Sequence, residues 1–72
     1  MSAAPRRLVY VGAFQDVGRV RVTWSDDWSE YCARLVDSSG ELVAEYFTDD
    51  RADALATADR MLADLAARQG LS

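Results

Sequence analysis

The link between the last expected strand and the only long helical pattern constrains the fold more than any other segment. Residues 46–53 read Tyr-Phe-Thr-Asp-Asp-Arg-Ala-Asp, so an aromatic strand end is followed at once by three aspartates. Asp49 or Asp50 can cap the N-terminus of a helix, and additional carboxylates favour the positive end of the helix dipole. The segment therefore predicts a strand that leads directly into a helix.

The residues after this link have the apolar spacing of an amphipathic helix. The apolar stripe consists of Leu55, Ala58, Leu62 and Leu65, widened by Ala54, Met61 and Ala66. The polar side consists of Asp53, Thr57, Arg60, Asp64 and Arg68. Gly70 is well placed to end the helix, because glycine tolerates the backbone conformation that follows a last helical turn.

Four strand-like segments precede the helix, over residues 8–14, 19–25, 30–36 and 41–47. They are rich in β-branched and aromatic residues, and short turn-forming segments separate them. Short turns between neighbouring strands imply an antiparallel meander. We therefore expect an α+β fold, β-β-β-β-α, with the helix packed on one face of the sheet. A chain of 72 residues is long enough for one domain, which we expect over residues 6–70, after a flexible tail over residues 1–5.

Hairpin arithmetic assigns side chains to the two faces of the sheet. A two-residue first turn would pair Ala13 with Val20, Val11 with Val22 and Val9 with Trp24, and these apolar residues would face the helix. In the second hairpin, the helix-facing set would be Tyr31, Ala33, Leu35, Leu42, Ala44 and Tyr46. The opposite register would bury the unpaired carboxylate of Glu45, which is costly.

The other sheet face has no second helix to cover it, and it is unusually apolar for a solvent-facing surface. The residues expected there are Leu8, Tyr10, Phe14, Arg19, Arg21, Cys32, Arg34, Val36, Val43, Glu45 and Phe47. The candidate interface within this set is Tyr10, Phe14, Arg19, Arg21, Arg34 and Phe47. Aromatics interleaved with arginines are typical of a nucleic-acid stacking platform, and also of a partner or homodimer interface. The net charge of −4 favours the protein interface.

Acidic residues gather at one end of the expected meander, where the second and fourth strands end and the third begins. They are Asp26, Asp27, Glu30, Asp49, Asp50 and Asp53. Such a cluster can dock a partner with a basic surface, or mimic the phosphates of a nucleic acid. The simpler alternative is two turn-forming loops and a helix cap. Arg6 and Arg7 fall at the same end and offset part of the charge.

The residue inventory excludes most catalytic chemistry. There is no histidine, and Cys32 is the only cysteine, so the usual zinc ligands and the Ser-His and Cys-His nucleophile pairs are missing. The aspartates of the link lack the alternating spacing of a calcium loop. We expect no enzyme activity, catalytic residue, metal or cofactor. No apolar run approaches the length of a membrane span, so we expect a cytoplasmic location and no membrane contact.

Two single residues allow alternative roles. Cys32 is expected beside Arg34, and a neighbouring cation can activate a thiol, although a small interface hydrophobe is the simpler role. Trp28 lies in the acidic loop, where its indole can either anchor a partner or fold back over the edge of the core.

Two stretches carry a family resemblance. Residues 30–35 (Glu-Tyr-Cys-Ala-Arg-Leu) and 45–58, which begin Glu-Tyr-Phe-Thr-Asp-Asp and run into an alanine-rich helix, resemble very small phage and prophage accessory proteins of GC-rich bacteria. The resemblance covers roughly residues 19 to 66. It implies a phage context, in which small proteins bind host proteins and inhibit host defence, as anti-CRISPR proteins do.

The sequence thus favours a non-enzymatic binding protein that modulates a host protein through its acidic surface, and the resemblance implies a phage origin. Two alternatives stay open. One is a nucleic-acid binder that uses the aromatic and arginine face of the sheet, and the other is a homodimeric structural or scaffolding module.

Overall fold

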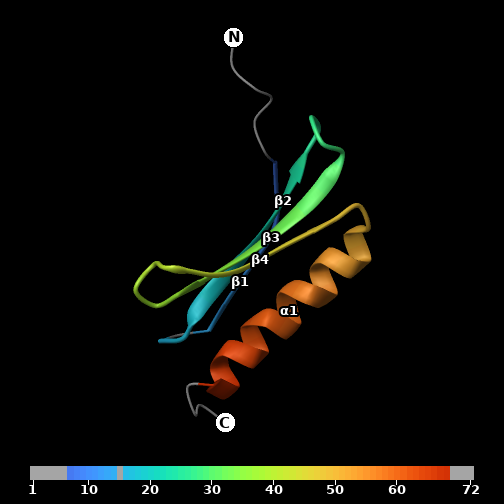
Figure 1. Ribbon diagram of the computed structural model, residues 1–72. Helices are drawn as coiled ribbons and strands as arrows, with labels where there is room; N and C mark the ends of the chain where they lie inside the picture. The colour runs from blue at the N-terminus through green and yellow to red at the C-terminus, as the bar shows by residue number, and fades with distance from the viewer. Residues whose placement is uncertain (1–6, 15, 69–72) are drawn as a thin grey trace.

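Four antiparallel strands followed by one helix make up the fold, which confirms the expected α+β meander (Figure 1). The computed structural model describes residues 7–14 and 16–68. The strands are β1 (Arg7–Phe14), β2 (Gly18–Ser25), β3 (Glu30–Asp37) and β4 (Leu42–Thr48), in the order β1-β2-β3-β4, and the helix is α1 (Arg51–Arg68). The expected tail and the expected cap at Gly70 lie outside the described residues.

The core lies between α1 and one face of the sheet, and the helix runs across all four strands (Figure 1). The sheet contributes Val20, Val22, Ala33 and Leu35, the turn between β1 and β2 contributes Val17, and the helix contributes Ala54, Ala58, Leu62, Leu65 and Ala66. The helical residues are those of the expected stripe. Three of them are alanines, whose small side chains allow the helix to approach the sheet closely. Burial of this apolar surface is the main force that holds the helix on the sheet.

The first hairpin differs from the expected register by one residue. Phe14 pairs with Gly18, so three residues rather than two connect β1 and β2. Asp16 adopts a left-handed backbone conformation with a φ of 65°, and the Val17 amide donates to the Phe14 carbonyl at 3.1 Å, which closes a tight turn. This geometry brings Val17 into the core, where it is 1% exposed. A two-residue turn would not supply this buried valine.

The changed register exchanges the faces of β1. Tyr10 pairs with Val22 and Phe14 pairs with Gly18, so both lie on the helix-facing side. The sequence predicts the opposite face for both residues, and this prediction is wrong. Val11 and Ala13 take the opposite face instead. A bulge between Leu8 and Tyr10 then allows both Val9 and Tyr10 to pack against the core.

The second hairpin confirms five of its six expected helix-facing residues. Tyr31, Ala33, Leu35, Ala44 and Tyr46 all lie on the core side. Leu42 is the exception, because a register shift near the start of β4 pairs it with Val36 and leaves it exposed.

Val43 is displaced by the same shift. Instead of lying on the outer side as expected, it borders a hollow beside the helix, together with Ala44, Met61 and Leu65. The irregularity therefore exchanges the positions of two neighbouring apolar side chains at the edge of the sheet.

The turn between β3 and β4 is organised by one carboxylate. Asp37 Oδ1 accepts hydrogen bonds from Ser39 N (2.9 Å), Ser39 Oγ (2.6 Å) and Glu41 N (3.0 Å). The Ser39 hydroxyl and the Glu41 amide hold the pKa of Asp37 below its ordinary value. Gly40 adopts a positive φ of 91°, which only glycine enters readily. The turn is thus determined locally by side chains that the sequence places there.

Candidate functional site

The topology brings the six acidic residues to one end of the molecule, as the sequence predicts. Ser25 at the end of β2 pairs with Glu30 at the start of β3, and Tyr31 pairs with Thr48 at the end of β4. The loop after β2 and the link before α1 therefore share this end. We call the set Asp26, Asp27, Glu30, Asp49, Asp50 and Asp53 the acidic end.

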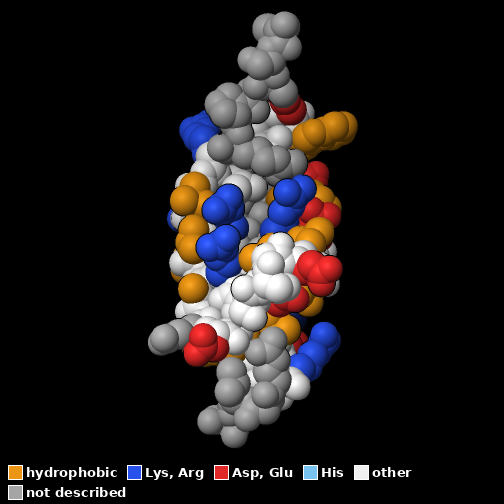
Figure 2. All heavy atoms as spheres, turned by 90° about the vertical axis from the view of Figure 1, so that its left-hand side faces the viewer, with side chains coloured by type: hydrophobic (Ala, Val, Ile, Leu, Met, Phe, Trp, Pro, Cys, Tyr) orange, Lys and Arg blue, Asp and Glu red, His pale blue; other side chains and the backbone are white. Residues whose placement is uncertain are grey.

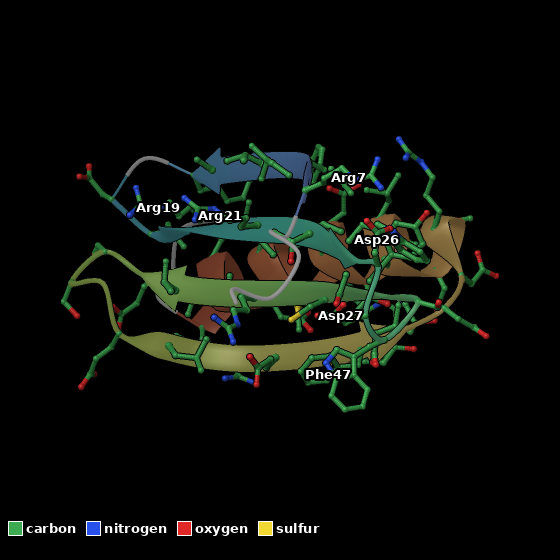
Figure 3. The ribbon with its side chains drawn as sticks, turned by 90° about the horizontal axis from the view of Figure 1, so that it is seen from above. Arg7, Arg19, Arg21, Asp26, Asp27 and Phe47 are labelled. Atoms are coloured by element: carbon green, nitrogen blue, oxygen red, sulfur yellow. The ribbon has the colours of Figure 1, made fainter. Side chains whose placement is uncertain are left out.

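Asp26 is held within this end by two donors. Arg7 donates to both of its carboxylate oxygens, at 3.0 and 2.9 Å, and Trp24 Nε1 donates to Oδ1 at 2.6 Å. The hydrogen bonds from Arg7 and then from Trp24 lower the pKa of Asp26. The Arg7–Asp26 pair lies at the end of β2 (Figure 3). The negative charge of Asp26 is therefore compensated by Arg7.

Two further aspartates stabilise the start of the helix. Asp50 Oδ1 accepts from the backbone N–H groups of Ala52 (2.9 Å) and Asp53 (3.3 Å), which is the geometry of an N-cap. The Tyr46 hydroxyl donates to Asp53 Oδ2 at 2.6 Å and ties β4 to the first turn of α1. This bond, and then one from Thr48, lowers the pKa of Asp53.

Three acidic side chains remain for solvent or a partner. The carboxylates of Asp27, Glu30 and Asp49 make no hydrogen bond or ion pair with any residue of 7–14 or 16–68. Trp28 lies among them with 73% of its surface exposed, so the indole does not fold back over the core. Three carboxylates of the acidic end thus maintain the local structure, and the other three remain available around the exposed indole of Trp28.

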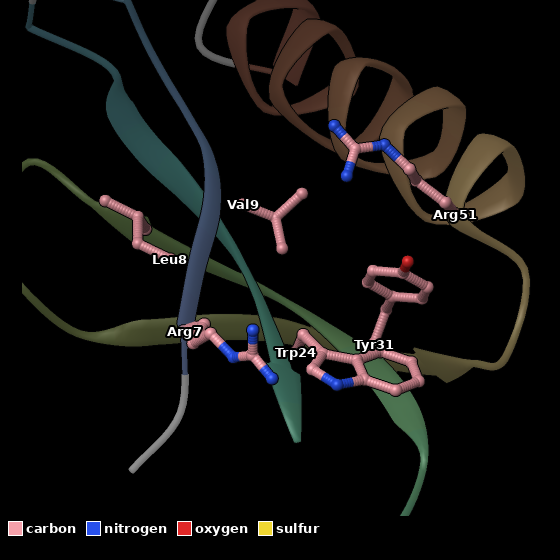
Figure 4. A pocket seen from close by; sticks show the side chains of 6 residues that line it. All are labelled: Arg7, Leu8, Val9, Trp24, Tyr31 and Arg51. Carbon is pink, nitrogen blue, oxygen red and sulfur yellow. The ribbon is translucent and has the colours of Figure 1, made fainter. Parts of the chain in front are cut away.

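A shallow hollow of about 430 Å³ opens between β1 and the first turn of α1 (Figure 4). It is lined by Arg7, Leu8, Val9, Trp24, Tyr31 and Arg51. The rings of Trp24 and Tyr31 form its floor, tilted by 56° with centroids 4.6 Å apart. The Arg7 guanidinium on its rim is already engaged by Asp26. Arg51 is a second cation in the lining and forms no ion pair within the described residues. Two arginines at the edge of an open, shallow hollow do not by themselves define a ligand site.

The sheet face opposite the helix is covered by no element of the described chain (Figures 1 and 3). Cross-strand pairing arranges its side chains in three rows that run from β1 to β4. The rows are Leu8–Thr23–Cys32–Phe47, Val11–Arg21–Arg34–Glu45 and Ala13–Arg19–Val36–Leu42. We call these twelve residues the outer face.

Basic and apolar side chains share the outer face. In the space-filling view, arginines gather near its middle with hydrophobic side chains beside them (Figure 2). Leu8 is 61% exposed and Phe47 is 49% exposed, and Val11 and Leu42 are exposed as well. Exposed aliphatic and aromatic groups next to arginines are the composition of the centre of a protein interface.

The middle row carries the charges. Arg21 lies directly opposite Arg34, and Arg34 lies directly opposite Glu45. Arg34 Nε donates to Glu45 Oε2 at 2.6 Å, and this bond raises the already high pKa of the Arg34 guanidinium. Arg19 and Arg21 form no ion pair within the described residues. The outer face thus carries three cations and one carboxylate.

Two hollows border this charged row. One, of about 460 Å³, is lined by Leu8, Arg21, Thr23 and Arg34, and the other, of about 190 Å³, is lined by Arg19, Arg21, Arg34 and Val36. Both share the Arg21 and Arg34 side chains. An anionic group that entered either hollow would meet two guanidinium groups on neighbouring strands.

The expected stacking platform is wrong in two of its three aromatic residues. Tyr10 lies on the helix side, where its hydroxyl donates to Asp59 at 3.1 Å and fills the space above Gly12. Phe14 pairs with Gly18 and lies on the same side as Tyr10. The one-residue change in the first hairpin removes both aromatics from the outer face. Of the expected set, Arg19, Arg21, Arg34 and Phe47 are brought together there.

The sequence pattern places Leu8 on this face, as found, but leaves it out of the candidate interface, and it places Val11 and Leu42 on the helix side. The signal that bears on Val11 is Asp16, a residue type that tolerates the left-handed conformation of a three-residue loop. That loop length decides the face on which every residue of β1 lies.

Cys32 lies in the first row of the outer face, yet only 1% of its surface is exposed. The Arg34 guanidinium interacts with it, as expected from their positions two residues apart. A thiol so deeply buried is inaccessible to large reagents, which fits the role of a small packing residue better than that of a nucleophile.

The ranges 7–14 and 16–68 hold no group of three or more Cys, Asp or Glu side chains arranged to bind a metal ion. The described helix is not long and apolar enough to cross a membrane. By fold, the chain is an α+β protein in which one helix covers a four-stranded antiparallel meander. In comparisons with known proteins, no protein-family model, no curated protein and no solved structure matches the chain.

Proposed function

We propose that the chain is a small non-enzymatic binding protein that holds a partner protein against its outer face. The observation that carries this proposal is the combination of Leu8, Val11 and Phe47, all substantially exposed, with the arginines of the middle of the sheet. Apolar side chains exposed together on one uncovered face are costly in water, and in soluble proteins such surface marks binding sites. The resemblance to phage accessory proteins makes a bacterial host protein the proposed partner, and modulation of that protein the proposed outcome.

The acidic end is a second candidate surface, and the exposed Trp28 favours it. Tryptophan is enriched among the residues that dominate binding energy, and Asp27 and Asp49 near it would attract a basic partner. Asp26, Asp50 and Asp53 already serve an ion pair, a helix cap and a strand–helix bond. The acidic end therefore has fewer side chains to offer a partner than the sequence suggests.

Pull-down from a bacterial lysate with matched variants tests which surface binds. Arg19→Gln/Arg21→Gln removes two charges from the outer face, and Arg60→Gln/Arg68→Gln removes two from the exposed side of α1. Asp27→Asn/Asp49→Asn removes two charges from the acidic end. All six residues are exposed, so the variants should fold, and circular dichroism verifies this.

With the bait held at or below the native Kd, we expect the outer-face variant to lose at least about 80% of the captured partner, because a tenfold weaker affinity then lowers occupancy from about one half to about one tenth. The helix variant should capture as much as the native chain. If the Asp27→Asn/Asp49→Asn variant loses capture and the outer-face variant does not, the acidic end is the binding surface and the outer-face proposal is wrong.

A further inference from the structure

The guanidinium groups of Arg21 and Arg34 share two hollows of the outer face. Resting on the proposed function, we propose that they bind the carboxylates of an acidic partner segment, with Leu8 and Phe47 as its apolar contacts. The partner segment would therefore alternate acidic and apolar side chains.

The charge of the middle row favours a carboxylate as the ligand. Arg21 and Arg34 are directly opposite each other, which brings two like charges to about the closest cross-strand separation in a sheet. Glu45 engages Arg34 through Nε and leaves Arg21 without a carboxylate in the described chain. A carboxylate placed between the two guanidinium groups would satisfy donors of both and relieve their repulsion.

The space beside this row can admit an acidic side chain. The hollow of about 460 Å³ has Arg21 and Arg34 as its charged walls and Leu8 as an apolar wall. An aspartate or glutamate side chain entering from solvent would find donors and apolar surface in the same place. The smaller hollow adds Arg19 and Val36 on the other side of the same pair. The geometry thus suits carboxylates spaced along a chain rather than a single isolated ion.

The side chains of the outer face suit an acidic protein segment better than a nucleic acid. A nucleic-acid strand gains much of its affinity from bases stacked on aromatic rings, and Phe47 is the only aromatic residue in the three rows. Leu8 and Val11 offer aliphatic surface, which suits apolar side chains.

Acidic residues also lie beyond both ends of the strands, on either side of the arginines. Asp16 lies at one end of the sheet, and Asp27 and Asp49 lie at the other. A long polyanion laid along the strands would meet these like charges, whereas a short acidic segment would contact only the arginines.

A second copy of the chain does not fit this face. If two outer faces packed together about a two-fold axis, the central arginines of one copy would oppose those of the other. Each copy supplies only Glu45 as a compensating acid among its twelve outer residues. Like-charge contacts of this kind disfavour an interface. The partner must therefore bring the acidic groups itself.

The test is an NMR titration with three defined probes. The first is a blocked hexapeptide in which aspartates alternate with leucine and phenylalanine, the second is its asparagine counterpart, and the third is a short oligothymidylate. The salt concentration is kept at about 20 mM, where charges are weakly screened. The signals followed are the Arg21 and Arg34 Nε–H groups and the amides of Leu8 and Phe47.

We expect the acidic peptide to bind with a Kd below about 1 mM, at least about tenfold tighter than its asparagine counterpart. The shifts should centre on Arg21 and Arg34. Arg21→Gln should weaken binding at least about fivefold, and Arg60→Gln should leave it unchanged. Higher salt should weaken the acidic peptide more than the neutral one.

Three results would overturn the inference. They are an acidic peptide that fails to bind, an oligothymidylate that binds as tightly as the peptide, and shifts confined to the acidic end or to α1. Equal binding of the neutral and acidic peptides at the outer face would remove the carboxylate subsite while leaving the proposed function intact. The proposed function is tested separately by the lysate pull-down, and it fails if the outer-face variant captures as much partner as the native chain while the acidic-end variant loses capture.

Discussion

Arg21 on β2 and Arg34 on β3 occupy directly opposite positions in an antiparallel sheet, on the face that the helix does not cover. Like charges in this relationship oppose folding, because they are held close together whether or not a partner is present. Only Arg34 has a carboxylate beside it, in Glu45. The pair is thus a local cost to stability at the centre of the surface proposed for binding.

The first prediction follows from that cost. Arg21→Thr should raise the free energy of unfolding by roughly 0.2–1 kcal/mol, because it removes the like charge opposite Arg34 and adds a residue with good strand propensity. Arg19→Thr is the matched control, because Arg19 lies opposite Val36 and its replacement shares only the propensity gain. Urea denaturation at low salt measures both. Equal gains in the two variants would show that the Arg21–Arg34 repulsion is negligible.

The second prediction concerns the start of the helix. Asp50→Ala should cost about 1 kcal/mol, since it removes the side chain that accepts hydrogen bonds from the Ala52 and Asp53 amides. Asp49→Ala should change stability little, because Asp49 is exposed and its carboxylate makes no hydrogen bond or ion pair with a described residue. Thermal or urea unfolding compares the two. A larger loss for Asp49→Ala would contradict the assignment of the cap.

The third prediction is a pH dependence of the Tyr46–Asp53 bond. Its pairing lowers the pKa of Asp53, so the stability that it contributes is present above the ordinary aspartate pKa of about 4 and is lost as pH falls through the lowered value. The same pairing, led by the bond to Asp53, raises the pKa of Tyr46. In the alkaline range, the stability that the bond contributes is therefore complete below the ordinary tyrosine pKa of about 10 and is lost as pH rises through the raised pKa of Tyr46.

Tyr46→Phe should therefore lower the urea midpoint at neutral pH, and its difference from the native chain should shrink in strong acid and in strong base. Tyr31→Phe is the control, because the Tyr31 hydroxyl makes no hydrogen bond with a described residue. A Tyr46→Phe difference that stays constant from pH 2 to pH 11 would exclude the bond as its cause.

The fourth prediction concerns self-association, one of the alternatives that the sequence leaves open. The arginines of the outer face should keep the chain monomeric at low salt, because two such faces repel each other. Sedimentation velocity at two concentrations measures this. A dimer that forms at low salt and is lost in Arg21→Gln would contradict the assignment of an acidic partner to this face.

The amino-acid pattern predicts the fold well because its signals are local and agree with one another. The apolar period of residues 54–66 and the aspartates before it place the helix, and Asp50 proves to be the cap among the two candidates. Strand bounds differ from expectation by no more than one residue at either end. These features depend on neighbours along the chain, which a sequence displays directly.

Which residues share a face is harder to predict, because one residue in a turn inverts a whole strand. The three-residue loop at Asp16 and the bulge before Tyr10 are tertiary outcomes, selected because they bury Val17 and allow Val9 and Tyr10 to pack on the core. The pattern of β1 is apolar on both sides, so it does not choose between the two registers. The candidate site changed for this reason, while the fold did not.

Hydroxyl-radical footprinting of the chain, alone and bound to its captured partner, tests the central claim most directly. Phe47 and Leu8 report on the outer face, and Trp28 reports on the acidic end, because each side chain is well exposed in the isolated chain. If the outer face binds the partner, Phe47 and Leu8 become protected while Trp28 stays as reactive as before. Protection of Trp28 with unchanged Phe47 and Leu8 would contradict the claim and assign binding to the acidic end.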